Sequence, residues 1–273
     1  MKCSICIATF NHSRLLVHTL DSIYRQQPRF PFEVIVVDDG SATSDAWLVC
    51  SQYPALRYVR IDREPTYRNP SRARNVAYKA ARGEIIVAQS DDVVHHSHDC
   101  LQRLADELKP GTFVIASVTN VDGLSRPYRD PNGRGYGDRL KVYTGPANRR
   151  PLFFLGSLYR HDLYCAGGND EEFADPSGED QWFALCLTRG LGLRPIYSSS
   201  IVGHHQHHNH TQDYTAVARS QAVLKLKIDQ AQRGAIPWRS SAGQWSMDCP
   251  STESRDQRST GVSYPSERKA PTV

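Results

Sequence analysis

The sequence contains no long apolar run, and it has few cysteines. No segment of the 273-residue chain approaches the ~20 apolar residues that a membrane-spanning helix needs. The N-terminus enters an expected strand at once, without the apolar stretch and cleavage site of a signal peptide. The seven cysteines are odd in number and scattered, which favours a reducing compartment over a disulfide framework. We therefore expect a cytoplasmic protein with no transmembrane segment.

The charge pattern lacks a basic block. The formal net charge is +4, and the lysines and arginines are dispersed along the chain. Proteins that bind nucleic acid usually concentrate these residues on one face or in one run. Nucleic acid is therefore not an expected partner. With 39% hydrophobic residues, the chain has enough apolar material for a sizeable globular core.

Strand-like and helix-like segments alternate over the first 90 residues. Short runs of branched apolar residues predict strands buried on both faces, and each is followed by a segment with helical spacing of apolar residues. The expected strands are 2–9, 33–38, 56–61 and 84–90, and the expected helices are 12–27, 42–53 and 71–82, the last with Ser71 as N-cap. This alternation predicts an α/β fold with a mostly parallel, doubly wound sheet flanked by helices.

The alternation loosens after residue 93. Helices are expected at 98–108, 179–189 and 214–233, strands at 113–119 and 194–198, and further ordered structure at 152–166. Residues 122–150 are rich in Gly, Pro, Asn and Arg, which predicts a long loop. The last segment is mostly polar, so we expect a single domain over 1–235 and a disordered tail over 236–273.

Two of the expected strands end in paired carboxylates. Asp38 and Asp39 follow one apolar run, and Asp91 and Asp92 follow another. In a parallel sheet the carboxyl ends of the strands share one edge, where ligands bind. Carboxylates gathered this closely repel one another unless a cation or the donors of a ligand lie among them. A binding site at this edge is therefore expected, the alternative being that each pair caps the next helix.

Four motifs then follow one another in order. They are Ile7–Asn11, Val37–Ser41, the run Ser71–Asn75 with Gly83-Glu84 and Ser90–Asp92, and the pair Gly167–Phe173 and Gly178–Trp182. The ordered set resembles the family 2 glycosyltransferases, which have the GT-A fold, and covers roughly residues 2–205. It departs from the family at Gln89, where an aspartate is usual, and at 68–71, where a glycine-rich stretch is usual.

The resemblance implies a nucleotide site made by Ala8, Thr9 and Asp39. A carboxylate such as that of Asp39 can accept the imide N–H of uracil, which would select a uridine nucleotide. The alternative for Asp39 is a turn residue before Gly40. Arg74, and with less support Arg72, would bind phosphate from the start of a helix.

The resemblance also implies a cation site. Asp92 would hold Mn²⁺ or Mg²⁺ against the diphosphate, and Asp91 would lie nearer the ribose or sugar. In many GT-A enzymes a late histidine completes this site. Residues 203–210 carry five histidines, of which His205 is favoured over His204, with His207 also possible. A separate zinc site and a solvated loop are the alternatives.

By the same resemblance, Asp180 would be the general base that takes the acceptor's proton, with Glu179 beside it in contact with substrate. Asp180 can instead close a capping box with Ser177. Trp182 is expected in the core, although it can also serve as a platform for the acceptor sugar.

The expected activity is a metal-dependent, inverting transfer from a nucleotide sugar, favouring a UDP-sugar, to a saccharide or other hydroxyl acceptor. Two alternatives stay open. One is a protein that binds nucleotide sugars without turnover. The other is a sugar nucleotidyltransferase, for which the expected phosphate loop is missing after residue 9.

Overall fold

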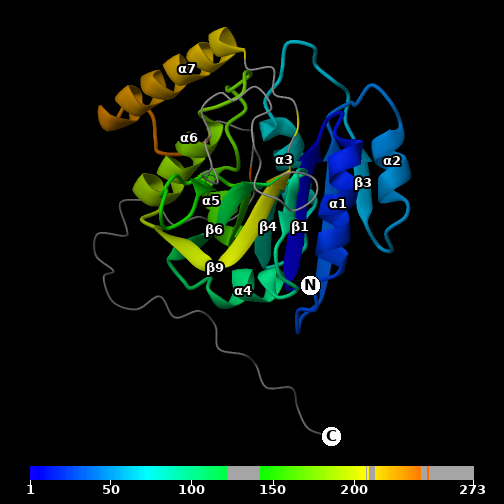
Figure 1. The fold of residues 1–273 in the computed structure, drawn as a ribbon. Helices are drawn as coiled ribbons and strands as arrows, with labels where there is room; N and C mark the ends of the chain where they lie inside the picture. The colour runs from blue at the N-terminus through cyan, green and yellow to red at the C-terminus, as the bar shows by residue number, and fades with distance from the viewer. Residues whose placement is uncertain (122–141, 207, 209–212, 241–244, 246–273) are drawn as a thin grey trace, which may run out of the picture.

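We analysed a computed structural model in which residues 1–121, 142–206, 208, 213–240 and 245 are described. Over these ranges nine strands form one sheet with the order β3-β2-β1-β4-β8-β6-β9-β5, and β7 pairs with β6. Helices cover both faces of this sheet (Figure 1). The expected single α/β domain is thereby confirmed. No described helix is both long enough and apolar enough to cross a membrane.

The first half of the fold matches the expected alternation. The parallel strands are β1 (Cys3–Thr9), β2 (Phe32–Asp38), β3 (Arg57–Arg60) and β4 (Ile85–Ser90). The helices between them are α1 (Ser13–Tyr24), α2 (Asp45–Cys50) and α3 (Ser71–Ala80). The expected N-cap at Ser71 is wrong. Ser71 is the first helical residue, and the Asn69 side chain accepts hydrogen bonds from its N–H and its hydroxyl.

The second half mixes parallel and antiparallel pairs. Its strands are β5 (Val93–His95), β6 (Thr112–Val121), β7 (Val142–Thr144), β8 (Leu155–Tyr159) and β9 (Arg194–Gln206). Its helices are α4 (Cys100–Asp106), α5 (Arg160–Ala166), α6 (Glu179–Leu185), a π-helical turn η1 (Cys186–Gly190) and α7 (Tyr214–Gln232). Strand β8 is antiparallel to both β4 and β6, whereas β6 and β9 are parallel. The sequence did not predict β5 or β7.

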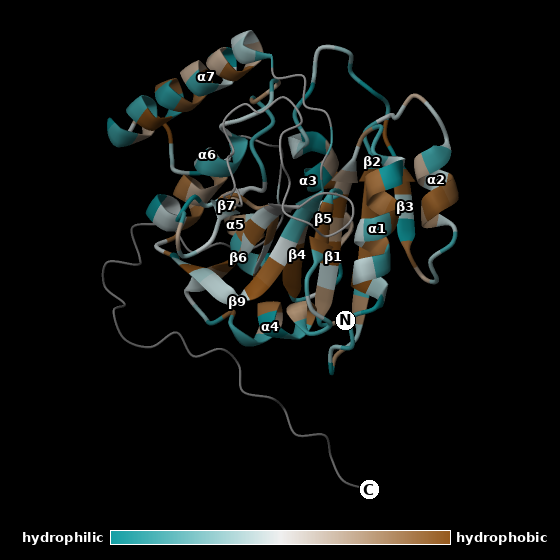
Figure 2. Ribbon diagram, in the orientation of Figure 1, coloured by the Kyte–Doolittle hydropathy of each residue, from teal (hydrophilic) through white to brown (hydrophobic). Residues whose placement is uncertain are grey.

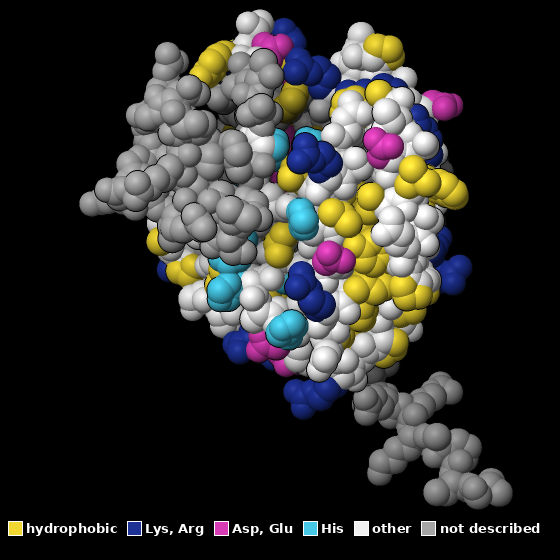
Figure 3. Space-filling view, turned by 45° about the vertical axis from the view of Figure 1, so that its right-hand side comes forward, with side chains coloured by type: hydrophobic (Ala, Val, Ile, Leu, Met, Phe, Trp, Pro, Cys, Tyr) yellow, Lys and Arg dark blue, Asp and Glu magenta, His cyan; other side chains and the backbone are white. Residues whose placement is uncertain are grey.

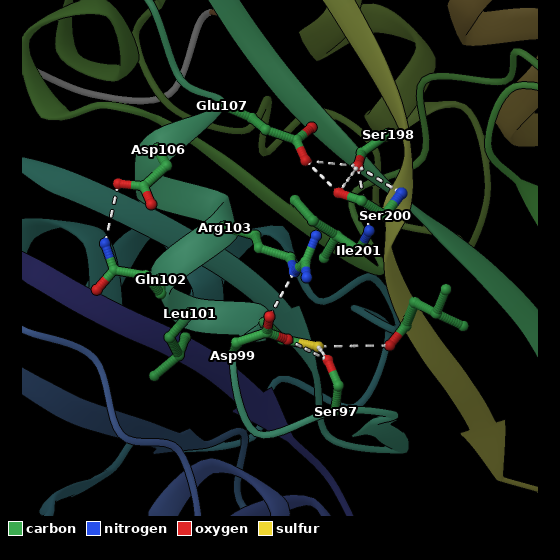
Figure 4. Close-up of polar contacts among 12 residues, drawn as sticks. Ser97, Asp99, Leu101, Gln102, Arg103, Asp106, Glu107, Ser198, Ser200 and Ile201 are labelled. Carbon is green, nitrogen blue, oxygen red and sulfur yellow. Dashed lines mark hydrogen bonds and ion pairs between the residues drawn. The ribbon is translucent and has the colours of Figure 1, made fainter.

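Strand β9 runs eight residues beyond the expected end at 198. The serines at 198–200 hide its continuation, because they interrupt the apolar pattern at a register shift against β6. The end of helix α4 contacts this irregular stretch. Glu107 follows the helix and accepts hydrogen bonds from the hydroxyls of Ser198 and Ser200 (Figure 4). The strand then resumes and pairs with β5 through His204 and His205.

Two apolar layers enclose the sheet. One lies under α1 and α4 and includes Ile5 and Ile7 of β1. The other lies under α3, α5 and α6 and includes Cys6 of the same strand. The central strands are accordingly apolar on both faces, as the brown strands at the centre of Figure 2 show. This burial raises the pKa of the Cys6 thiol, mainly through desolvation, and so disfavours its reactive thiolate form.

Packing against the core continues past residue 235, the expected domain boundary. The Trp238 ring lies 5.6 Å from the ring of Trp182, and Trp245 is only 6% exposed in the same core. Residues 246–273 and 122–141, which include most of the expected tail and loop, lie outside the described residues. Cys165 is disulfide-bonded, which the expectation of scattered, reduced cysteines did not foresee.

Candidate active site

The carboxyl ends of β1, β2 and β4 meet at one edge of the sheet. Thr9 is paired with Asp38 across β1 and β2, and Ala8 is paired with Ser90 across β1 and β4. The Asp39 N–H donates to the Thr9 carbonyl over 2.9 Å. The Thr9 hydroxyl is buried and has no hydrogen-bond partner among the described residues. The expected nucleotide residues therefore lie together.

The two carboxylates after β2 have different surroundings. Asp38 is fully buried and accepts from Ser41, Tyr58 and Arg60, so it holds the turn in place. Asp39 instead contacts Arg63 at 2.5 Å. Burial raises the pKa of Asp39, and Arg63 opposes that effect.

Arg63 lies at this edge although the sequence did not indicate it. Its guanidinium carbon is 3.7 Å from the centroid of the Phe10 ring, while its Nη1 contacts Asp39. Arg63 follows β3 by three residues, and this position was the available signal, because the carboxyl end of β3 lies beside that of β2.

Asp92 faces two imidazoles. Its Oδ2 lies 3.1 Å from Nε2 of His205 and 3.0 Å from Nε2 of His208. Burial raises the pKa of Asp92, but the hydrogen bonds from the two histidines outweigh it and hold the pKa well below its usual range. The other oxygen, Oδ1, is buried and has no hydrogen-bond partner among the described residues. These three side chains could hold a metal ion.

Asp91 joins the same cluster from the other side. His12 Nδ1 lies 3.4 Å from Asp91 Oδ1, and this hydrogen bond raises the pKa of His12 against the effect of burial. The His12 and His208 rings are 4.8 Å apart. His12, Asp91 and Asp92 form a second group that could hold a metal ion. His12 and His208 were not predicted as site residues from the sequence, although His12 follows β1 by three residues.

The structure separates the three histidines considered beforehand. His205 lies with Asp92, whereas His204 Nε2 lies 2.7 Å from Nδ1 of His96. His207 lies outside the described residues. Histidine side chains reach the surface on the face drawn in Figure 3.

Gln89 does not replace a ligand. Its amide nitrogen donates to the Val93 carbonyl, and its amide oxygen lies 2.9 Å from Nε2 of the buried His95. The position where the family usually has an aspartate is therefore used here to join β4 to β5.

Two helix starts meet at a second part of the site. Arg74 in the first turn of α3 donates to Asp180 Oδ1 at the start of α6, over 2.8 Å. Arg72 instead pairs with Glu64 at the surface. The capping box is wrong, because α6 is capped by Gly178, at a φ of 89°, and the Ser177 hydroxyl accepts from Gln221.

Glu179 lies beside that pair. It is 7% exposed, and its Oε2 has no hydrogen-bond partner among the described residues. Burial, and then the charge of Asp180, raise the pKa of Glu179 to about 7. Trp182, one turn on, is fully buried in the core, as expected.

The segment Gly167–Phe173 is fixed from two helices. The Asn75 amide of α3 donates to the Asn169 carbonyl and to Glu171, and its oxygen accepts from the Asn169 N–H. From α7, Lys227 contacts Asp170 at 3.0 Å and Glu172 at 2.7 Å. Asn75 follows Arg74 in α3, so the same helix turn holds this segment and contacts Asp180 at the start of α6.

The sequence of this chain matches a known protein family. Glycosyl transferase family 2 matches residues 4–164. The chain belongs to this family of glycosyltransferases. The uncharacterized glycosyltransferase YwdF of Bacillus subtilis is 30% identical over 212 residues, covering 74% of each chain.

Two further proteins extend the comparison. The poly(ribitol-phosphate) β-N-acetylglucosaminyltransferase TarS of Staphylococcus aureus is 28% identical over 193 residues, covering 68% of this chain and 32% of TarS. The chain thus spans about a third of TarS. The structure of TarS residues 1–349 with UDP-GlcNAc superposes with a TM-score of 0.58 at 19% identity, covering 84% and 66% of the two chains.

A mannosyltransferase from Pyrobaculum calidifontis, PcManGT, solved with GDP-Man and Mn²⁺, gives a TM-score of 0.56 at 20% identity, covering 85% and 64% of the two chains. At these identities both structures establish the shared GT-A fold and nothing finer.

Proposed function

We propose that this chain is a metal-dependent, inverting glycosyltransferase that moves a sugar from a uridine-linked nucleotide sugar to a hydroxyl acceptor. The observation that carries the proposal is the convergence of Asp92, His205 and His208 at the carboxyl edge of the sheet. The buried Oδ1 of Asp92 has no hydrogen-bond donor among the residues that the structure describes, and a cation satisfies such an atom.

The donor set fits a divalent cation. Carboxylate oxygen and imidazole nitrogen are ordinary ligands of such ions, and Asp91 adds negative charge nearby. When bound, the ion neutralises the departing nucleoside diphosphate and so makes it a better leaving group. The PcManGT complex contains Mn²⁺ and a nucleotide sugar, which supports this assignment.

Asp39, Thr9 and Ala8 would hold the nucleotide. The Asp39 carboxylate can accept the uracil imide N–H in place of Arg63. The Thr9 hydroxyl, which has no partner in the described part of the chain, offers a further hydrogen bond. The TarS complex with UDP-GlcNAc supports a uridine nucleotide. Arg74 uses one donor on Asp180 and has others that can reach the diphosphate, while Asp91 and Glu179 would contact the sugar.

Asp180 would act as the base. In an inverting transfer the acceptor hydroxyl attacks the anomeric carbon in line and must lose its proton to a carboxylate opposite the leaving group. The guanidinium of Arg74 lies 2.8 Å from Oδ1 of Asp180 and fixes the orientation of this carboxylate. The same ion pair also suits a protein that binds nucleotide sugars without turnover, because Arg74 occupies the carboxylate.

Two measurements test the proposal. Thermal melting with UDP, GDP and UDP-sugars, each with and without Mn²⁺, should show a metal-dependent rise in melting temperature for uridine ligands. Transfer of labelled sugar from the donor that binds should then exceed hydrolysis to water, with inverted configuration at the anomeric carbon. Binding without any transfer across saccharide acceptors would support the non-catalytic alternative.

The substitution Asp92→Ala provides the internal check. It should remove the metal-dependent part of donor binding, and excess chelator should do the same to the parent protein. Asp45→Ala, at an exposed acidic residue on α2, is the matched control and should bind donor normally. Full activity in excess chelator would exclude the metal.

A further inference from the structure

The proposed cation site, made by Asp92, His205 and His208, contains two histidines, whereas the resemblance implied only one. His205 and His208 both direct Nε2 at the same oxygen of Asp92, at 3.1 and 3.0 Å. The three potential ligand atoms all lie within 4.8 Å of one another. His205 comes from β9, and His208 follows the end of that strand. Three side chains therefore converge without any contribution from a substrate.

The separations match adjacent ligands of one ion. Two atoms at neighbouring corners of an octahedron, each about 2.1 Å from the metal, lie about 3.0 Å apart. Asp92 Oδ2 keeps this distance from both nitrogens. Each imidazole would bind the ion through an unprotonated Nε2, since only a neutral imidazole with a free nitrogen can bind a metal.

The ligand types discriminate between cations. Mg²⁺ prefers oxygen ligands, keeps several waters, and usually binds one or two carboxylates together with substrate phosphates. Two imidazoles and one carboxylate instead suit first-row transition ions, whose affinities rise from Mn²⁺ through Co²⁺ to Ni²⁺. A three-ligand site can also bind its ion before the diphosphate arrives.

We propose that Asp92, His205 and His208 form a three-ligand site that holds a transition-metal ion in the absence of nucleotide and excludes Mg²⁺. This inference rests on the cation site of the proposed function and narrows it. His208 is the decisive ligand, because a site with Asp92 and His205 alone would depend on the oxygens of the donor.

The test measures metal binding by the full chain after chelator treatment, with no nucleotide present. Calorimetric titration with Co²⁺ should give one ion per chain, with weaker binding of Mn²⁺ and no displacement by excess Mg²⁺. Loss of even an outer partner of a metal ligand usually costs about 10–100-fold in affinity. His208→Gln and His205→Gln should therefore each weaken Co²⁺ binding at least tenfold.

His204→Gln is the matched control. His204 is the neighbouring residue on β9 and contacts His96 instead of Asp92, so this change should leave Co²⁺ affinity unaltered. X-ray absorption of the cobalt-loaded parent protein should show two imidazole ligands, which keeps the test decisive if a variant fails to fold.

Three results would overturn the inference: binding only when UDP is present, equal competition by Mg²⁺, or fewer than two imidazole ligands. The transfer assay separates this failure from failure of the proposed function. Sugar transfer without nucleotide-free metal binding would refute only the inference. Metal binding without transfer would refute only the function.

Discussion

Arg74 and Asp180 lie 106 residues apart in the sequence and form an ion pair of 2.8 Å in which both side chains are about nine-tenths buried. Each occupies the first turn of its helix, so the pair joins the start of α3 to the start of α6. A buried pair of this kind orients the carboxylate. It gives the proposed base a fixed direction before substrate binds.

Asp180→Asn should therefore leave the fold and donor binding intact and lower turnover by roughly 10²–10⁴, the usual contribution of a general base. The amide oxygen can still accept a hydrogen bond from Arg74, so the substituted side chain keeps its place. Turnover and thermal melting should be measured together, with Asp175→Asn as the control, because Asp175 forms an ion pair with the exposed Arg219 outside the proposed site. A destabilised variant with unchanged turnover would make Asp180 a structural residue.

Sequence patterns predicted the first half of the fold well because its strands are continuous apolar runs. The runs ending at Thr9, Asp38 and Ser90 need no partner to be recognised. Strand β9 was cut short because its polar residues become strand-like only through pairing with β5 and β6. Such pairing depends on tertiary contacts, which local patterns do not contain.

Site residues that directly follow a strand could be predicted from the sequence. Site residues that lie in irregular segments could not. Asp39 and Asp92 come directly after apolar strands, so their common edge followed from topology. The sequence favoured His205 only slightly over His204. In the structure His205 contacts Asp92, whereas His204 contacts His96. His208 lies beyond the strand, where no residue period indicates direction.

Glu179→Gln should change how stability depends on pH. The folded pKa of Glu179 is raised from 4.5 to about 7, so between these values the folded protein binds more protons than the unfolded chain. Stability of the parent protein consequently falls as pH rises through this window. The variant lacks this loss and should gain stability relative to the parent from pH 4.5 upward, levelling off above pH 7.

Urea unfolding of both proteins at several pH values provides the measurement. Titrating groups that do not interact with Glu179 are shared by the two proteins and cancel in the difference. A difference that stays constant across the window would show that Glu179 is ionised throughout.

Lys227→Met should destabilise the protein by about 3–5 kcal/mol, because removing one partner of a buried ion pair leaves the other charge uncompensated. Lys227 is 5% exposed, and Asp170 is fully buried. Lys225→Met, at an exposed position on the same helix, should change stability by less than about 0.5 kcal/mol. Adding Asp170→Asn to Lys227→Met should restore much of the loss. If denaturant unfolding shows equal effects of the two lysine variants, the ion pair between Lys227 and Asp170 does not stabilise the fold.

Trp245→Ala should cost about 3 kcal/mol of stability, the range for deleting a large aromatic side chain from a core. The indole is 6% exposed, its ring lies 4.8 Å from that of Tyr164 in an edge-on arrangement, and Lys79 Nζ lies 4.9 Å from its centroid. Tyr264→Ala is the comparison, since that residue belongs to the polar stretch that the sequence predicts to be disordered. Denaturant unfolding should give a large loss for the first variant and none for the second. If both variants unfold like the parent protein, the core does not extend to residue 245, and the boundary near 235 expected from composition is correct.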